Sequence, residues 1–108
     1  MVTSFNNKTI SAVYSVLPSQ EVDFLDEARN YSFSEAQMLK LKKVMGFGTR
    51  RVAKEGETVA DYAIYGIQQM LNDGVFKEEE IGAIIVTTTS PDHFIPPVSN
   101  IIQGKFNF

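Results

Sequence analysis

The stretch IGAIIVTTT, residues 81–89, decides the fold. It is a nearly continuous run of apolar and β-branched side chains, which is the composition of a β-strand buried on both faces. An amphipathic surface strand would instead alternate apolar and polar residues. A strand buried in this way needs neighbouring strands, which a chain of 108 residues scarcely provides. The pattern therefore indicates that the chain is part of something larger.

A helix is expected on each side of this strand. The preceding helix begins at Thr58, whose hydroxyl can cap the amides that follow, and its apolar residues recur at helical spacing as far as residues 72–74. Gly66 lies inside this helix, where glycine costs about 1 kcal/mol relative to alanine, so we expect a close packing contact there. Residues 90–97 (SPDHFIPP) form a rigid connection to the second helix, whose first turn accommodates Pro97.

The first half of the chain adds a strand and a helix. Residues 9–17 (TISAVYSVL) are rich in β-branched and aromatic side chains and are followed by a proline, which predicts a strand that stops there. Ser32 and Glu35 have the spacing of a capping box, which predicts a helix over residues 33–45 that ends at Gly46. The order strand, helix, helix, buried strand, helix predicts an α/β fold.

Composition and charge exclude several classes of protein. With 44% hydrophobic and 21% charged residues, residues 1–108 fit a single small domain rather than a disordered chain. The net charge of -3 argues against nucleic acid or an anionic membrane as the main partner, because both require a basic surface. The sequence has no cysteine and so no disulfide and no thiol nucleophile. No signal or membrane-spanning segment is evident, so a cytoplasmic protein is expected.

Some segments could be interpreted as functional sites, but each of them also has a simpler structural interpretation. Residues 46–51 (GFGTRR) look like a phosphate loop but follow a helix, so Gly46 is interpreted as a helix C-cap and Arg50 and Arg51 as partners of acidic helices. His93, the one histidine, follows the buried strand without a visible partner and is interpreted as a loop or capping residue. Residues 77–80 predict a solvated turn. No metal site and no cofactor are predicted.

Short segments along the chain occur in a distinctive order and spacing. They are Leu17-Pro18, MGFGTRRVA (residues 45–53), GETVAD (56–61), IGAIIVTTTSP (81–91) and Ile95-Pro96. Together they resemble the start of beta-ketoacyl-acyl-carrier-protein synthase III, a branch of the thiolase superfamily. The resemblance spans nearly the whole chain.

The resemblance implies the N-terminal portion of the first half of a thiolase-like fold, a mixed sheet with packed helices, in a homodimer. Members of the family condense an acyl thioester, acyl-coenzyme A or acyl-acyl carrier protein, with malonyl-acyl carrier protein in a decarboxylative Claisen reaction of fatty acid synthesis. A cysteine at a helix N-terminus takes the acyl group, and a histidine and an asparagine stabilise charge. All three would lie beyond Phe108, so this chain is expected to hold no catalytic residue and to be inert alone.

The resemblance carries over four binding residues. Ile95 occupies the place of a residue that reaches across the dimer and closes the partner's acyl pocket, with Phe94 beside it. Lys40 and Val44 stand where bacterial members have a tryptophan and an arginine that hold the adenine end of coenzyme A. Acyl-carrier-protein donors are therefore favoured over coenzyme A donors.

Two other interpretations stay open. The chain is alternatively part of a specialised relative in the same superfamily, such as an aryl-lipid or resorcinol synthase, or it is an α/β interaction module without chemistry. If it is a fragment, the reading frame is expected to continue past Phe108. Self-association is then also expected, because residues 84–86 and the apolar face of Ile101, Ile102 and Phe106 would lack their partners.

Overall fold

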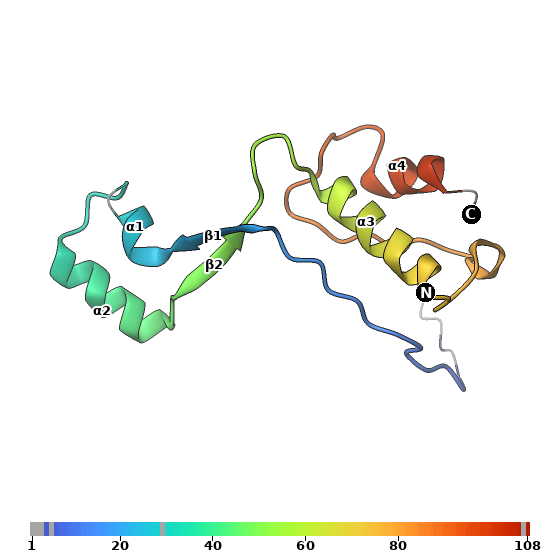
Figure 1. Cartoon of the computed structure of the whole chain (residues 1–108), viewed down its shortest axis with the longest axis horizontal. Coiled ribbons are helices and arrows are strands. Elements are labelled where there is room, and N and C mark those ends of the chain that lie inside the picture. Colours follow the sequence, from blue (N-terminus) through green and yellow to red (C-terminus); the bar gives the residue numbers. More distant parts are fainter. Residues whose placement is uncertain (1–3, 5, 29, 107) are drawn as a thin grey trace. The chain divides into compact units, whose positions relative to one another are not determined.

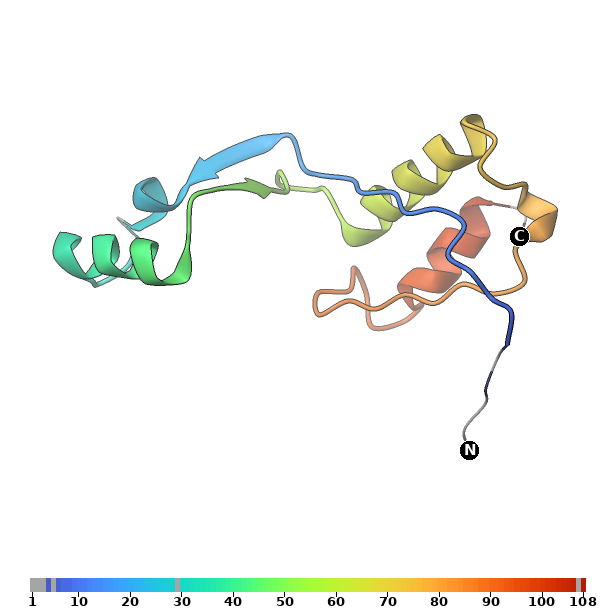
Figure 2. The same cartoon turned by 90° about the horizontal axis from the view of Figure 1, so that it is seen from below.

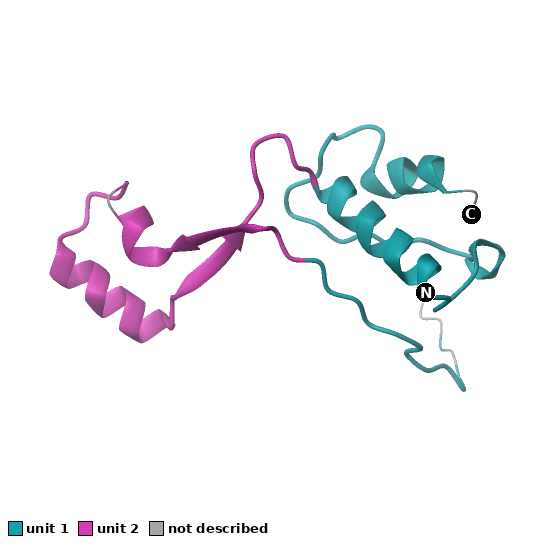
Figure 3. Ribbon diagram, in the orientation of Figure 1, with its two compact units in different colours: residues 1–16, 59–108 teal, residues 17–58 magenta. Residues whose placement is uncertain are grey.

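The computed structural model describes residues 4, 6–28, 30–106 and 108, which form helices and one small sheet (Figure 1). In chain order the elements are β1 (Gln20–Asp23), α1 (Phe24–Ala28), α2 (Glu35–Met45), β2 (Thr49–Val52), α3 (Val59–Asn72), the 3₁₀ turn η1 (Glu78–Glu80) and α4 (Val98–Lys105). They belong to two compact units (Figure 3): unit 1 is Met1–Val16 with Val59–Phe108, and unit 2 is Leu17–Thr58. The expectation of a single partial domain stays a prediction.

Unit 2 is built around a two-stranded antiparallel sheet that the sequence did not predict. Strands β1 and β2 pair from Gln20 opposite Val52 to Asp23 opposite Thr49. Both strands are only four residues long and rich in charge, so neither shows the apolar alternation of a typical strand. Glu21 lies opposite Arg51 and forms an ion pair with it, which stabilises the pairing across the strands.

Helix α2 was predicted with the right end and the wrong beginning. It ends as expected at Gly46, which adopts the left-handed conformation with φ 69°. It begins at Glu35, where Ser34 is the N-cap and accepts a hydrogen bond from the Gln37 amide. Gln37 in turn accepts one from the Ser34 amide at 2.9 Å. The capping box is therefore Ser34 with Gln37, and the predicted box of Ser32 with Glu35 is wrong by two residues.

Unit 1 has an apolar core between α3 and α4. Ala60 of α3 is buried together with Val98, Ile102 and Phe106 from α4 and its C-terminal end. The ring of Phe108 stacks on that of Phe106 with their centroids 5.1 Å apart. Helix α3 was predicted within a residue of both its ends, and α4 begins one residue after Pro97, which was expected in its first turn. The face of Ile102 and Phe106 was expected to be exposed in a fragment, but its buried residues pack against α3.

The prediction of two strands in unit 1 is wrong. Residues 9–17 and 81–89 pair with no strand in the described part of the chain, and Figure 2 draws both as irregular chain. The prediction that residues 81–89 are buried on both faces is also wrong, because Ile84 and Val86 are half-buried while Ile85 is 91% exposed. β-branched residues favour an extended backbone, but a strand also requires a neighbour that accepts its hydrogen bonds.

The close contact predicted at Gly66 is present. A Cβ atom built on this glycine would lie 3.0 Å from Cγ2 of Val16 and 3.6 Å from Cδ1 of Tyr14. The N-terminal segment therefore crosses α3 where only a hydrogen atom fits without displacement. The conformational cost of a glycine in the middle of a helix is offset by this close approach.

Candidate functional site

The loop between residue 90 and α4 is held at both of its ends. Asp92 accepts a hydrogen bond from the backbone N–H of Ala60, with both carboxylate oxygens 3.3 Å from that nitrogen. Ala60 is the second residue of α3, so the carboxylate lies at the positive end of the helix dipole. At the other end Pro97 is the N-cap of α4, and its carbonyl accepts the amide of Asn100 at 2.9 Å. The backbone between these anchors is tied to two helices.

Phe94 and Ile95 lie between these anchors and face solvent. Their exposed fractions are 96% and 87%, among the highest of the large apolar side chains described, and the peptide bond from Ile95 to Pro96 is cis. Two adjacent apolar side chains on a tethered loop are suited to entering an apolar pocket of a partner, because their burial there removes apolar surface from water. The geometry is compatible with the predicted acyl-pocket gate, which stays a prediction.

His93 shows no arrangement for acid–base catalysis. Its side chain is exposed, and the neighbouring Asp92 is engaged by the α3 amide of Ala60. A general base needs a partner that orients its ring, and Asp92 is directed elsewhere. Sequence inspection missed the capping role of Asp92 because Ala60 lies 32 residues earlier in the chain, beyond any local motif.

Lys40 and Val44 lie one helical turn apart on α2, so they share a face of that helix. Both are exposed, Val44 to 71%. A cation beside an apolar side chain can bind a phosphate group or an acidic carrier, but it lacks the flat surface on which an adenine ring stacks. The two residues belong to unit 2, whereas Phe94 and Ile95 belong to unit 1.

The GFGTRR segment has a structural role in unit 2. Gly46 ends α2, and Arg50 and Arg51 lie in β2. Arg50 forms an ion pair with Glu27 of α1, as the interpretation from sequence requires. Arg51 pairs instead with Glu21, which is in a strand and not in an acidic helix. Both guanidinium groups are therefore engaged within the unit.

A carboxylate on β1 ties that strand to α2. Asp23 accepts the backbone N–H of Leu25 at 2.8 Å and lies 3.4 Å from the ammonium nitrogen of Lys42. The hydrogen bond from Leu25 is the largest influence on the pKa of Asp23, and together with the Lys42 cation it outweighs desolvation and lowers that pKa below its usual value. The interactions of Asp23 with Leu25 and Lys42 stabilise unit 2, and none of the candidate site residues takes part in them.

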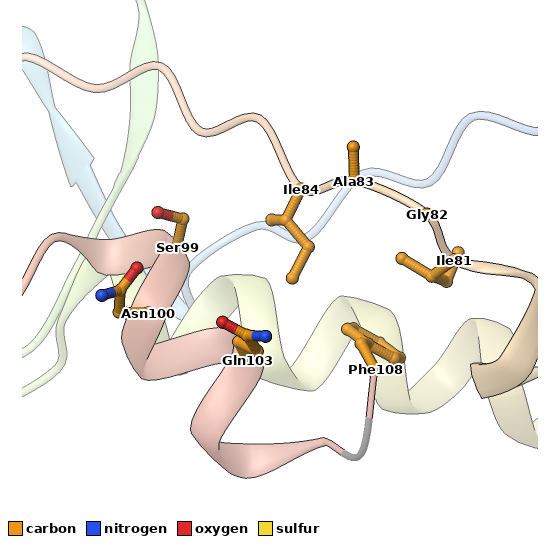
Figure 4. Close-up of a pocket in the computed structure, with 8 residues that line it drawn as sticks. All are labelled: Ile81, Gly82, Ala83, Ile84, Ser99, Asn100, Gln103 and Phe108. Carbon is orange, nitrogen blue, oxygen red and sulfur yellow. The ribbon is translucent and has the colours of Figure 1, made fainter.

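Each unit contains cavities that the sequence did not indicate. One cavity of unit 2 has a volume of about 310 Å³ and is lined mainly by aromatic and apolar side chains, including Phe24 and Phe47 with ring centroids 4.9 Å apart. One cavity of unit 1, shown in Figure 4, has a volume of about 200 Å³ and lies between residues 81–84, α4 and Phe108. None of the four predicted site residues lines either cavity.

The described residues offer neither a cluster of metal ligands nor a membrane-spanning helix. No three histidine, cysteine, aspartate or glutamate side chains among these residues gather where they could hold a metal ion. Within the same described part of the chain, none of the helices has the length and hydrophobicity needed to cross a membrane.

Several proteins with names of the synthase III type are similar to this chain in sequence. A Campylobacter jejuni protein provisionally named 3-oxoacyl-acyl-carrier-protein synthase 3 is 30% identical over 99% of this chain. A beta-ketoacyl-acyl-carrier-protein synthase III of Ehrlichia chaffeensis is 31% identical over 90% of the chain. One from Vibrio cholerae is 40% identical over 56% of it. The resemblance to beta-ketoacyl-acyl-carrier-protein synthase III is confirmed. No family model matches the chain.

The alignments cover only a part of each synthase III. The chain spans 31% of the Campylobacter protein and 30% of the Ehrlichia protein. The crystal structure of a 3-oxoacyl-acyl-carrier-protein synthase from Burkholderia xenovorans superposes on 85% of the chain with a TM-score of 0.74, at 18% identity, and the chain covers 26% of that structure. The predicted fold class, part of a thiolase-like α/β fold, is confirmed by this likeness.

Proposed function

We propose that the chain is the N-terminal part of a 3-oxoacyl-acyl-carrier-protein synthase III-like acyltransferase. The complete enzyme would be a cytoplasmic homodimer that condenses an acyl thioester with malonyl-acyl carrier protein in fatty acid synthesis. The main support is the 30% identity to the Campylobacter protein over 99% of the chain. The thiolase-like fold seen in the Burkholderia neighbour agrees with this proposal.

In this proposal the 108 residues bind and position, and the covalent chemistry belongs to the rest of the enzyme. The chain has no cysteine to carry an acyl group as a thioester. Its one histidine is exposed, and the adjacent Asp92 bonds to the α3 amide of Ala60. By itself the chain should therefore be inert toward acyl thioesters. Phe94 and Ile95 would close the acyl pocket of the partner subunit and limit the length of the primer.

The donor is proposed to be bound to a carrier protein. Lys40 supplies positive charge for a phosphate, whereas Val44 supplies neither a flat ring nor a charged donor. Stacking contributes about 0.5–2 kcal/mol and hydrogen bonds to charged groups about 1.5–3 kcal/mol, so their joint loss weakens coenzyme A binding on the order of a hundredfold. A carrier protein adds contacts of its own outside this helix and depends less on the lost groups.

A chimera tests the main proposal. The 108 residues replace the matching segment of the Campylobacter protein, and formation of the 3-ketoacyl product is measured with acyl and malonyl thioesters. The expected result is condensing activity in the chimera and none in the isolated chain. As a control, Ile102→Asp in the chimera disrupts the core of unit 1 and should abolish activity. A folded chimera without activity on any donor would contradict the enzyme proposal.

The inertness of the isolated chain has its own test. The chain is incubated with acyl-coenzyme A and its mass is measured. No adduct is expected, because the chain lacks a thiol. A stable single acyl group at one residue would contradict this part of the proposal.

The donor preference is tested in the active chimera. Lys40→Trp combined with Val44→Arg should lower the KM for acyl-coenzyme A by up to about a hundredfold and leave the KM for acyl-carrier protein nearly unchanged. Lys43→Trp, an exposed change on the same helix, is the matched control. Equal use of both donors before the change, or no gain after it, would overturn the donor proposal.

The same chimera separates the two other interpretations. Preference for aryl or long-chain primers would indicate a specialised relative, and Ile95→Phe should then shorten the longest primer that is accepted. A module without chemistry would give a folded but inactive chimera. Both outcomes can be recognised in one set of assays across primer lengths.

A further inference from the structure

Asp92 connects the loop of residues 90–97 to the first turn of α3. Both of its carboxylate oxygens lie 3.3 Å from the backbone nitrogen of Ala60, which donates the hydrogen bond. Ala60 is 3% exposed and belongs to the core of unit 1, and Asp92 is half-buried. The first amides of a helix have no acceptor within that helix, and a buried amide without an acceptor costs free energy. Asp92 supplies the acceptor from 32 residues further along the chain.

The bond from Ala60 to Asp92 is stronger than an ordinary loop contact. A carboxylate that accepts a backbone N–H forms a charge-assisted hydrogen bond, about twice as strong as one between neutral groups. Its negative charge also lies at the positive end of the α3 dipole. By contrast, the Ser90 amide donates to Oγ1 of Thr88 at 3.1 Å, which shapes the loop without attaching it to a helix. Asp92 therefore ties the loop to α3, and both residues of the contact belong to unit 1 (Figure 3).

The loop around Asp92 is short and stiff. Positions 91, 96 and 97 are prolines, each of which has a fixed φ angle and restricts the residue before it. Pro97 is the N-cap of α4, so the far end of the loop is attached to that helix. Phe94 and Ile95 follow Asp92 by two and three positions. With both ends attached and few free dihedral angles between them, the backbone position of Phe94 and Ile95 depends on where Asp92 is held.

We propose that Asp92 is a positioning residue that sets the length of the acyl primer. This inference rests on the proposed function, in which Phe94 and Ile95 close the acyl pocket of the partner subunit. By its bond to Ala60, Asp92 fixes the depth at which these two side chains end the pocket. One methylene group in an apolar pocket changes discrimination about 10–200-fold, so a small shift of the loop changes which primers fit. Asp92 acts through the loop and not on the substrate.

The first test measures the anchor in the intact 108-residue chain, without an enzymatic assay. Exchange of the Ala60 amide proton is followed by NMR in the wild type, Asp92→Ala and Asp92→Asn. Asp92→Ala should speed this exchange about tenfold or more, because the amide loses its acceptor. Asp92→Asn should restore much of the protection, because the side-chain amide oxygen also accepts a hydrogen bond. Equal exchange in the wild type and in Asp92→Ala would overturn the proposal.

The second test measures primer selectivity in the chimera with the Campylobacter protein. Values of kcat/KM are determined for acyl primers of increasing length. Asp92→Ala should raise the ratio of kcat/KM for long primers to that for short primers about tenfold, because the loop no longer ends the pocket at one depth. Asp92→Asn should keep the wild-type ratio. A purely structural role of Asp92 would lower kcat/KM for all primers alike and leave the ratio unchanged, which would overturn the proposal.

Two control variants separate positioning from general destabilisation. Leu71→Ala removes a half-buried side chain that packs against the core of unit 1 from the last turn of α3. It should lower stability and leave the primer ratio unchanged. His93→Ala removes an exposed side chain from the loop itself and should also leave the ratio unchanged. A rise in the ratio from either control as large as that from Asp92→Ala would overturn the proposal.

Failure of this inference can be distinguished from failure of the proposed function. A folded chimera that is inactive with every donor contradicts the proposed function and, with it, a role of Asp92 in primer length. An active chimera in which Asp92→Ala leaves the primer ratio unchanged, although the Ala60 amide has lost its protection, overturns this inference alone. The expected result is loss of amide protection together with the altered ratio, and recovery of both in Asp92→Asn.

Discussion

Unit 1 is held together by apolar contacts between helices, whereas unit 2 relies on a short sheet, ion pairs and little buried surface. Four of the five buried apolar residues, Ala60, Val98, Ile102 and Phe106, belong to the core of unit 1. In the described part of unit 2, only Met38 is buried to the same degree. A helix pair with a strong apolar pattern therefore forms a core from few residues, while short charged strands depend on specific pairing.

The two units also differ in net charge. Unit 2 contains seven of the ten basic and seven of the thirteen acidic residues, so its formal charges balance. The net charge of -3 therefore belongs to unit 1. Ion pairs such as Arg50 with Glu27 connect the elements of unit 2, and exposed pairs of this kind contribute at most about 1 kcal/mol each.

The largest expected effect is the loss of the core of unit 1. Ile102→Ala should lower the free energy of unfolding by about 2–5 kcal/mol, because the side chain is 2% exposed and its removal leaves a cavity. The measurement is a denaturant titration followed by circular dichroism. Ile10→Ala, at an exposed site of the same unit, should change it by at most about 0.5 kcal/mol. Equal effects of the two variants would contradict the core described for unit 1.

A smaller effect is expected where the N-terminal segment crosses α3. Gly66→Leu should destabilise the chain by about 1–3 kcal/mol, because its side chain has no room beside Val16. Gly104→Ala, on α4 where the new Cβ meets nothing within 4 Å beyond the backbone of its own helix, should instead stabilise it by about 0.5–1 kcal/mol. Thermal unfolding of both variants gives the comparison, and a stabilising Gly66→Leu would show that the segment does not pack there.

The next test concerns the N-cap of α2 in unit 2. Ser34→Ala should lower stability by about 0.5–2 kcal/mol, because the first turn of α2 loses the acceptor of the Gln37 amide. Ser32→Ala is the control and should have almost no effect. A larger effect at Ser32 would favour the capping box expected from sequence over the one observed. Urea titrations of the two variants decide between them.

The smallest expected effect is a pH dependence in unit 2. The pKa of Asp23 is lower in the folded chain than its ordinary value of 3.8, so its ionised form stabilises unit 2 above that value. That contribution is lost as the pH falls from about 4 through the lower folded pKa. The stability difference between the wild type and Asp23→Asn should therefore shrink between pH 6 and pH 2. A difference that is constant over this range would contradict the interaction with Leu25 and Lys42.

The helices were predictable because their signals are local. Gly46 ends α2 through a left-handed conformation that glycine adopts without strain, and the apolar spacing from Ala60 onward marks α3. The contact at Gly66 was predicted in the same way, since glycine inside a helix requires a compensating reason. The order of short motifs also indicated the family, and the relatives confirm it.

The strands were not predictable because their partners lie far along the chain. β1 and β2 pair across some thirty residues, and neither has an apolar pattern of its own. The candidate site shows the same limit. Sequence placed Phe94 and Ile95 in a loop, but the anchoring of that loop through Asp92 and Ala60 depends on a contact between residues 32 positions apart.

The three longer helices and the absence of a thiol nucleophile from these residues could be predicted from sequence alone, because each depends on residue type or on neighbours within a few positions. The family could be predicted as well, because it is marked by the order of short motifs along the chain. Only the tertiary structure decided that residues 81–89 have one packed and one open face. The β-branched composition of that segment is the same whether neighbouring strands cover it or not. Burial and hydrogen bonding depend on which segments lie beside it, and the structure shows Ile84 and Val86 against the core with Ile85 in solvent.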